Sequence, residues 1–132
     1  MPLRILCIED DAETRVLLKR ALEVQGMQVD AVWEGEKGLA AAKSGRFDCV
    51  LLDIMMPGLD GFGVLAELRQ DPLTRDVPVV VVTARADAES RERAMSLGAN
   101  EYVVKPFSFE RLRHIIQHLA AARAKPPEPP RS

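Results

Sequence analysis

Charged and polar side chains follow the apolar runs of this sequence, where each run ends. Glu9 and Asp10 follow the first run, Asp53 follows the third, Thr83 closes the fourth, and Lys105 follows the fifth. Short β-branched and aliphatic runs that alternate with helical patterns indicate buried parallel strands. In such sheets, ligands bind just beyond the carboxyl ends of the strands. The sequence therefore brings carboxylates, a hydroxyl and an ammonium to one edge of a sheet.

The carboxylates of Glu9, Asp10 and Asp53 predict a metal site at that edge. Like charges raise one another's pKa, so three carboxylates that share a few ångströms need a cation. Mg²⁺ is suitable because it takes about six hard oxygen ligands, commonly one or two carboxylates together with phosphate oxygens. A helix cap would account for Asp11, but it leaves Glu9 and Asp10 unexplained. We therefore expect Mg²⁺ as the cofactor.

Lys105 supplies the opposite charge at the same edge. An ammonium acts as a point charge that suits one phosphate or carboxylate oxygen. Lys105 precedes Pro106, so its backbone is extended and the bond between them can be cis. Phosphoryl transfer needs an in-line nucleophile, a metal ion and cations around the spread charge. Asp53, Mg²⁺ and Lys105 would provide those parts.

Alternating strands and helices must position these residues. We expect strands at 3–9, 28–33, 48–53, 77–83 and 101–104. We expect helices at 12–25, 35–43, 62–70 and 86–97, and a last helix that Ser108 caps and that ends near 123. Asp11 is the expected cap of the first helix, and Gly26 its stop signal. Five alternations predict a single α/β domain whose parallel sheet is covered on both faces.

Length and composition narrow the class of protein. The 132 residues are enough for one core, and a net charge of −2 offers no basic surface for direct nucleic-acid binding. The first residues do not resemble a signal peptide, and no apolar run is long enough to cross a membrane, so we expect a cytoplasmic protein. Cys7 and Cys49 lie in strand-like runs and are expected to be buried free thiols.

Two further segments are less informative. His114 and His118 have the i, i+4 spacing of some metal sites, but without a cysteine or carboxylate partner we interpret them as surface residues. From residue 124 the chain becomes rich in proline, which favours an extended segment. We expect a domain at 1–123 and, at 124–132, either a disordered tail or the start of a linker.

The ordered set of motifs resembles the receiver domains of two-component response regulators over about residues 3–123. The matching segments are Glu9-Asp10, Thr83-Ala84, Lys105-Pro106-Phe107 and Asp53-Ile54-Met55-Met56-Pro57-Gly58-Leu59-Asp60-Gly61. The resemblance implies a flavodoxin-like, doubly wound (βα)5 fold with strand order 2-1-3-4-5. It also implies a phosphorelay switch that is not an enzyme, although it assists its own phosphorylation and slow dephosphorylation.

The resemblance also assigns roles to residues. Asp53 would accept a phosphoryl group from the phosphohistidine of a sensor kinase or phosphotransfer protein. Lys105 would pair with the phosphate, and Thr83 would be the switch hydroxyl. Tyr102 would turn from an exposed to an inward position when Thr83 moves, which changes the face formed by the fourth helix, the fifth strand and the fifth helix. The implied Mg²⁺ ligands are the carboxylates of Glu9, Asp10 and Asp53 and the backbone carbonyl of Met55.

The output of the switch stays open. Receivers of winged-helix transcription factors dimerise through a charge set in which an acidic residue stands where this chain has Arg111. Arg91 would face Arg111 and repel it, so the residues disfavour that dimer. Three alternatives fit the sequence. The chain is a single-domain switch that acts on a protein partner, a receiver module cut from a larger transcription factor or hybrid kinase, or a free-standing aspartyl-phosphate phosphohydrolase.

Overall fold

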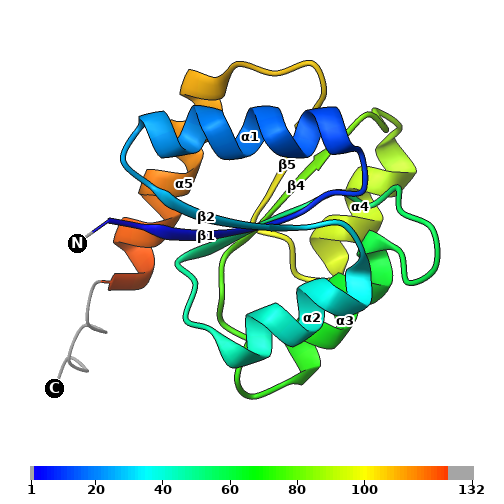
Figure 1. Ribbon diagram of the computed structural model, residues 1–132. Coiled ribbons are helices and arrows are strands. Elements are labelled where there is room, and N and C mark those ends of the chain that lie inside the picture. Colours follow the sequence, from blue (N-terminus) through cyan, green and yellow to red (C-terminus); the bar gives the residue numbers. More distant parts are fainter. Residues whose placement is uncertain (1, 125–132) are drawn as a thin grey trace, which may run out of the picture.

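A five-stranded parallel sheet lies between two layers of helices (Figure 1). The computed structural model describes residues 2–124. The strands are β1 (Arg4–Ile8), β2 (Gln28–Val32), β3 (Cys49–Leu52), β4 (Val79–Thr83) and β5 (Glu101–Val104). The helices are α1 (Ala12–Val24), α2 (Gly35–Ser44), α3 (Gly61–Gln70), α4 (Ala88–Ser96) and α5 (Phe109–Ala124). The strand order is β2-β1-β3-β4-β5, which confirms the doubly wound α/β fold expected from the sequence.

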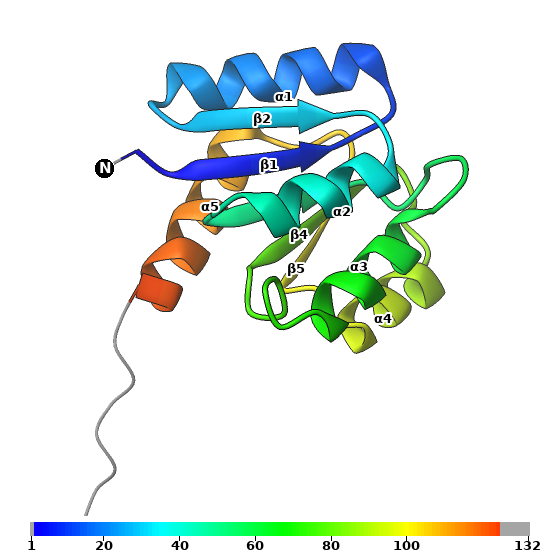
Figure 2. The same ribbon diagram turned by 60° about the horizontal axis from the view of Figure 1, so that its bottom comes forward.

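Helices cover both faces of the sheet, as Figure 2 shows from a second direction. Successive side chains of β1 point to opposite faces of the sheet. Leu6 and Ile8 pack with α2, α3 and α4, whereas Ile5 and Cys7 pack with α1 and α5. These four residues are at most 1% exposed. A strand that is buried on both faces needs an unbroken apolar run, and this explains the runs in the sequence.

Cys7 and Cys49 are free and buried, as expected. Burial raises the pKa of each thiol to about 12. Both side chains belong to the core between the sheet and the layer of α1 and α5, so they act as small apolar residues there. No helix within residues 2–124 has the length and apolar character needed to cross a membrane.

The element boundaries differ from the predicted ones by one or two residues at most positions. The strand predicted from Val77 begins at Val79, because the Val77 N–H bonds to the carbonyl of Thr74 in a turn and Pro78 has no N–H. The helix predicted from 86 begins at Ala88, because the Asp87 carboxylate caps it by accepting the N–H of Ser90 at 3.0 Å. The last helix includes Ala124, and the predicted tail beyond it lies outside the described residues.

Backbone hydrogen bonds continue past the carboxyl ends of the strands. The Glu9 N–H donates to the carbonyl of Val32 at 3.0 Å, and the Asp53 N–H donates to the carbonyl of Ile8 at 3.1 Å. The Lys105 N–H donates to the carbonyl of Thr83 at 2.8 Å. Three charged residues are therefore the first residues outside the sheet, and each is still tied to a neighbouring strand.

Candidate functional site

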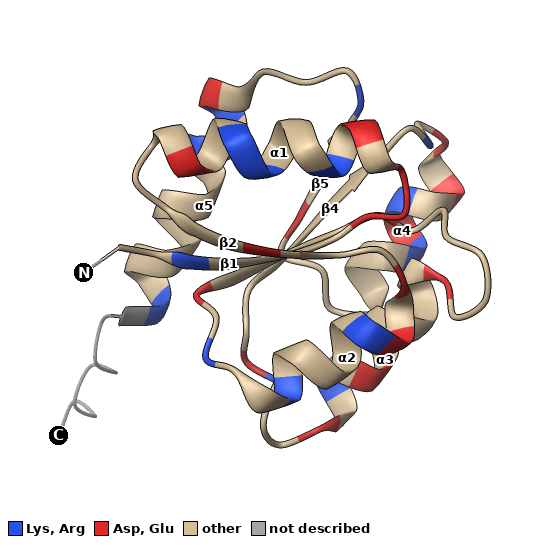
Figure 3. Cartoon of the chain, viewed as in Figure 1, with Lys and Arg blue, Asp and Glu red and all other residues tan. Residues whose placement is uncertain are grey.

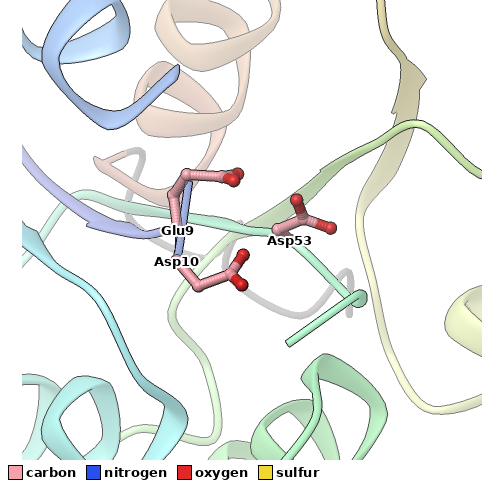
Figure 4. A group of neighbouring side chains, drawn as sticks. All are labelled: Glu9, Asp10 and Asp53. Carbon is pink, nitrogen blue, oxygen red and sulfur yellow. The ribbon is translucent and has the colours of Figure 1, made fainter. Parts of the chain in front are cut away.

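Three carboxylates meet at the carboxyl edge of the sheet. Glu9 and Asp10 follow β1, Asp53 follows β3, and the two strands are neighbours with Ile8 opposite Leu52. One oxygen from each carboxylate lies within 4.8 Å of the others. Figure 4 shows the Glu9 and Asp10 side chains extending toward the side of Asp53. The three residues therefore lie together in the structure, as the sequence predicts.

Burial differs among the three acids. Glu9 is 2% exposed and Asp53 is 5% exposed, whereas Asp10 is exposed to solvent. Acidic residues also mark the turn between β1 and α1 in the charge-coloured view (Figure 3). Two buried negative charges without a cation would be strongly unfavourable, so the site requires positive charge from elsewhere in the chain or from a ligand.

Lys105 provides part of that positive charge. Its Nζ lies 2.9 Å from Oδ2 of Asp53 and 3.1 Å from Oε2 of Glu9. Burial disfavours the ammonium, but the hydrogen bonds and attraction to Asp53 and then Glu9 outweigh it, so the pKa of Lys105 is raised. The peptide bond between Lys105 and Pro106 is cis. One lysine thus reaches across from the end of β5 to both buried acids.

The charge of the site is only partly balanced by Lys105. Burial, and next the nearby Asp53 carboxylate, raises the pKa of Glu9 to about 7, while Lys105 opposes the rise. A carboxylic acid whose pKa is raised this far beside a second buried acid indicates room for more positive charge. The donor set consists of hard oxygens, which is the chemistry that Mg²⁺ prefers. The residues present therefore fit a magnesium ion.

The two oxygens of Asp53 have different partners. Oδ1 accepts the backbone N–H of Met55 at 2.9 Å, and Oδ2 faces Lys105. This arrangement fixes the plane of the carboxylate and directs Oδ2 toward the charged groups. Met55, whose carbonyl is the predicted metal ligand, lies in the loop that directly follows Asp53. Its side chain is half exposed.

Thr83 and Tyr102, the two predicted switch residues, are both buried and both bonded to the backbone of Arg85. The Thr83 hydroxyl accepts the Arg85 N–H at 3.3 Å, and the Tyr102 hydroxyl donates to the Arg85 carbonyl at 2.7 Å. Tyr102 is 2% exposed, so its ring is already inward in this structure. The two side chains are thus joined through one intervening residue, a link that the sequence did not suggest.

A further residue near the acids was not selected from the sequence. Nη1 of Arg15 donates to the carbonyls of Glu9 and Asp10 at 3.0 and 3.3 Å. Its only sequence signal was a basic residue at the end of the first turn of a helix that begins next to an acidic pair. By contrast, His114 and His118 are exposed on α5, as expected for surface histidines.

Comparison with known sequences identifies the domain. The family model described as the response regulator receiver domain matches residues 5–117. Transcriptional regulatory protein TcrA of Mycobacterium tuberculosis is 39% identical over 127 residues, which cover 96% of this chain and 49% of TcrA. Transcriptional activator protein IrlR of Burkholderia pseudomallei is 41% identical over 110 residues, which cover 83% of this chain and 47% of IrlR. The chain spans about half the length of these curated relatives.

Solved structures agree with this match. The receiver domain of sensor histidine kinase PA1611 from Pseudomonas aeruginosa is 30% identical, with a TM-score of 0.86 over 92% of this chain and 99% of that one. Its crystal structure has a magnesium ion coordinated in the active site cleft. Response regulator TrrA from Thermotoga maritima, in complex with Mg²⁺ and BeF, is 36% identical, with a TM-score of 0.80 over 90% of this chain and 99% of that one.

Proposed function

Because this chain belongs to the family of response regulator receiver domains, we propose that it is a phosphorylatable signalling switch with Asp53 as the phosphoacceptor. The donor would be the phosphohistidine of a sensor kinase or phosphotransfer protein. The observation that carries the proposal is the contact of the buried Asp53 carboxylate with Lys105 at 2.9 Å, beside the acidic pair Glu9 and Asp10.

The contacts of Asp53 support its role as the nucleophile. Oδ1 is held by the N–H of Met55, which leaves Oδ2 to attack phosphorus. The new Oδ2–P bond would form as the bond from phosphorus to the histidine nitrogen breaks, and the imidazole would leave with the electron pair. Lys105, which is 2.9 Å from Oδ2 in the resting site, would then pair with a phosphoryl oxygen.

Glu9, Asp10, Asp53 and the carbonyl of Met55 are the proposed magnesium ligands. When bound, Mg²⁺ would supply positive charge that offsets the negative charge of the carboxylates and of an incoming phosphoryl group. Asp10 is the exposed member of the cluster, so it would admit the ion from solvent, whereas Glu9 is fixed by its contact with Lys105. The ammonium is not a metal ligand, so Lys105→Ala should keep the metal site but transmit the signal poorly.

Asp10→Asn should weaken Mg²⁺ binding by at least about tenfold, because the number of charged ligands sets the affinity of such sites. Isothermal calorimetry of the folded variant measures this change. Asp11→Asn is the matched control: it removes a neighbouring negative charge outside the cluster but keeps an N-cap side chain for α1. Equal affinities for Asp10→Asn and wild type would remove Asp10 from the site.

The bonds to Arg85 suggest how phosphorylation could reach the surface. A phosphoryl group adds acceptor oxygens that can draw the Thr83 hydroxyl toward Asp53. That movement would break the bond between Thr83 and the Arg85 N–H, while Tyr102 holds the Arg85 carbonyl. Arg85 lies just before α4, so the response would fall on the face formed by α4, β5 and α5. Since Tyr102 is already inward, phosphorylation would stabilise this ring position.

Thr83→Ala should leave Asp53 open to phosphorylation but uncouple this face. Amide chemical-shift mapping with and without beryllium fluoride and Mg²⁺ tests the expectation. In wild type, shifts in α4, β5 and α5 should exceed those in α1 and α2, and Thr83→Ala should lose most of the distant shifts. Thr83→Ser retains the hydroxyl and should retain the response. An undiminished distant response in Thr83→Ala would mean that the switch works by another route.

A groove beside Lys105 offers a place for the phosphodonor protein. It has a volume of about 280 Å³ between α1 and the segment that connects β5 to α5, and Leu17, Phe107 and Phe109 contribute to its apolar lining. Leu17 and Phe109 are 58% and 41% exposed. A partner that presents apolar side chains here would be placed next to the phosphoacceptor, as phosphotransfer requires.

The output partner of the switch is proposed to be of one of two kinds. Relatives such as TcrA and IrlR are transcriptional regulators about twice as long as this chain, so an attached output domain is one possibility and a separate protein partner is the other. The length of the complete gene product distinguishes them. We further propose that the receiver extends through the end of α5 at Ala124, one residue beyond the sequence prediction of 1–123, and that the residues after it are a tail or linker. We also propose that the phosphorylated form loses its phosphoryl group slowly without acting as an enzyme on other substrates.

A further inference from the structure

Arg15 joins the acidic turn to an aromatic side chain on the neighbouring strand end. Its Nη1 donates to the carbonyls of Glu9 and Asp10, and its guanidinium carbon lies 5.9 Å from the centre of the Trp33 ring. Trp33 directly follows β2, whose last residue, Val32, accepts the Glu9 N–H. Arg15 is therefore held between the turn that carries two acids and the strand end beside it.

These bonds act on the two peptide groups that determine where the acids point. Glu9 has further restraints, since its N–H bonds to Val32 and its side chain contacts Lys105. Asp10 is exposed, and the bond from Arg15 to its carbonyl ties its backbone to α1. A guanidinium can hold two acceptors while its face rests on an aromatic ring, which an ammonium does less well.

We propose that Arg15, seated against Trp33, is a positioning residue that orients Glu9 and Asp10 for a divalent cation. The inference rests on the proposed function, because it concerns the same magnesium site. Arg15 would not contact the ion. It would instead fix the backbone of the turn, so that less order has to be gained when the carboxylates close around the metal.

Charge alone would produce the opposite effect. Arg15 is a cation close to the site, and a neighbouring cation repels Mg²⁺. If Arg15 acted only through its charge, removing that charge would tighten metal binding. If it positions the acids, removing it should weaken binding in spite of the lost repulsion. The sign of the change therefore separates the two roles.

Lys37 provides a matched control. Its Nζ lies 4.1 Å from the centre of the same Trp33 ring, but within the described residues no hydrogen bond joins Lys37 to the acidic turn. Lys37→Gln thus removes a nearby positive charge and a contact to Trp33 while leaving the bonds of Arg15 in place. It should leave Mg²⁺ affinity within about twofold of wild type, since exposed charges interact weakly through water.

The test is calorimetric Mg²⁺ titration of wild type, Arg15→Gln, Arg15→Lys and Lys37→Gln. Arg15→Gln should bind Mg²⁺ about tenfold more weakly, the size of effect typical of residues that orient metal ligands. Arg15→Lys keeps the positive charge but lacks the planar guanidinium with its several N–H donors. Its Mg²⁺ affinity should lie between those of Arg15→Gln and wild type. If Arg15→Gln does not fold, the test rests on Arg15→Lys. A Mg²⁺ affinity of Arg15→Lys equal to that of wild type would overturn the proposal. Tighter or unchanged binding by folded Arg15→Gln would also overturn it.

Fluorescence gives a second readout that a general loss of stability would not reproduce. Trp33 is the single tryptophan of the chain, and it contacts Arg15. Mg²⁺ should change its emission in wild type and in Lys37→Gln, but not in folded Arg15→Gln. A wild-type protein that binds Mg²⁺ without any change in emission would count against the coupling of Arg15 to the site. A wild-type protein that binds no Mg²⁺ would instead refute the proposed metal site itself.

Discussion

Replacement of Asp53 by Asn is expected to abolish phosphorylation of this chain. Wild-type protein incubated with acetyl phosphate and Mg²⁺ should gain one phosphoryl group in intact-mass spectrometry, and Asp53→Asn should gain none. The amide lacks the anionic oxygen that attacks phosphorus, and it weakens the contact with Lys105 that places Oδ2. The change conserves size, so the fold should persist.

A control for this result is Asp76→Asn. Asp76 lies in the segment between α3 and β4, and its side chain is 85% exposed and pairs only with its neighbour Arg75 within the described residues. This variant should be phosphorylated like wild type. Equal phosphate on Asp53→Asn and wild type would show that the acceptor is another residue, and fragment masses would then identify it.

Gly61→Ala is expected to destabilise the fold by about 3 kcal/mol, in the upper range for an overpacked site. Gly61 is the first residue of α3 and is buried against the loop that follows Asp53. A Cβ at this position would overlap the Cα of Ile54 and lie 2.5 Å from the carbonyl oxygen of Asp53. Both are backbone atoms, so the helix and the loop would have to separate. Urea unfolding measures the loss, and the displaced loop should also weaken Mg²⁺ binding.

Gly63→Ala, two residues along the same helix, is the matched control. Its Cβ would meet Cδ1 of Leu59 at 2.6 Å, which is the end of a flexible side chain on a partly buried residue. Leu59 can turn away, and alanine favours helix by up to about 1 kcal/mol over glycine, so the stability should change little. If the two variants were equally stable, the close packing of α3 on the Asp53 loop would not be important for the fold.

The fold and the acidic cluster were predictable from the sequence because they depend on simple patterns. Buried parallel strands produce apolar runs, and the residue that ends each run must lie at the carboxyl edge of the sheet. The range predicted for β5 matches the observed strand, and Asp11 caps α1 as expected. Where boundaries moved, as at Val77 and Asp87, local turns and caps decided the first residue.

Contacts between distant side chains were less predictable. The inward position of Tyr102 depends on a hydrogen bond to the carbonyl of Arg85, and no periodic pattern encodes a bond of that kind. Arg15 is equally hard to select, since an arginine in the first turn of a helix that covers a sheet usually faces solvent. Its contact with Trp33 requires the spatial neighbourhood of α1 and the end of β2, which only the folded chain provides.

The backbone hydrogen bonds that continue beyond the strand ends bear on what the proposed phosphodonor has to contribute to the reaction. Asp53, Glu9 and Lys105 are each fixed by the neighbouring strand before any donor arrives. On the proposed function, the reacting groups therefore need no assembly by a partner, and a small phosphorylated molecule would be able to use them as a protein would. A sensor kinase would then contribute selectivity and timing rather than reactivity. Discrimination among competing kinases would have to come from residues outside the acidic site.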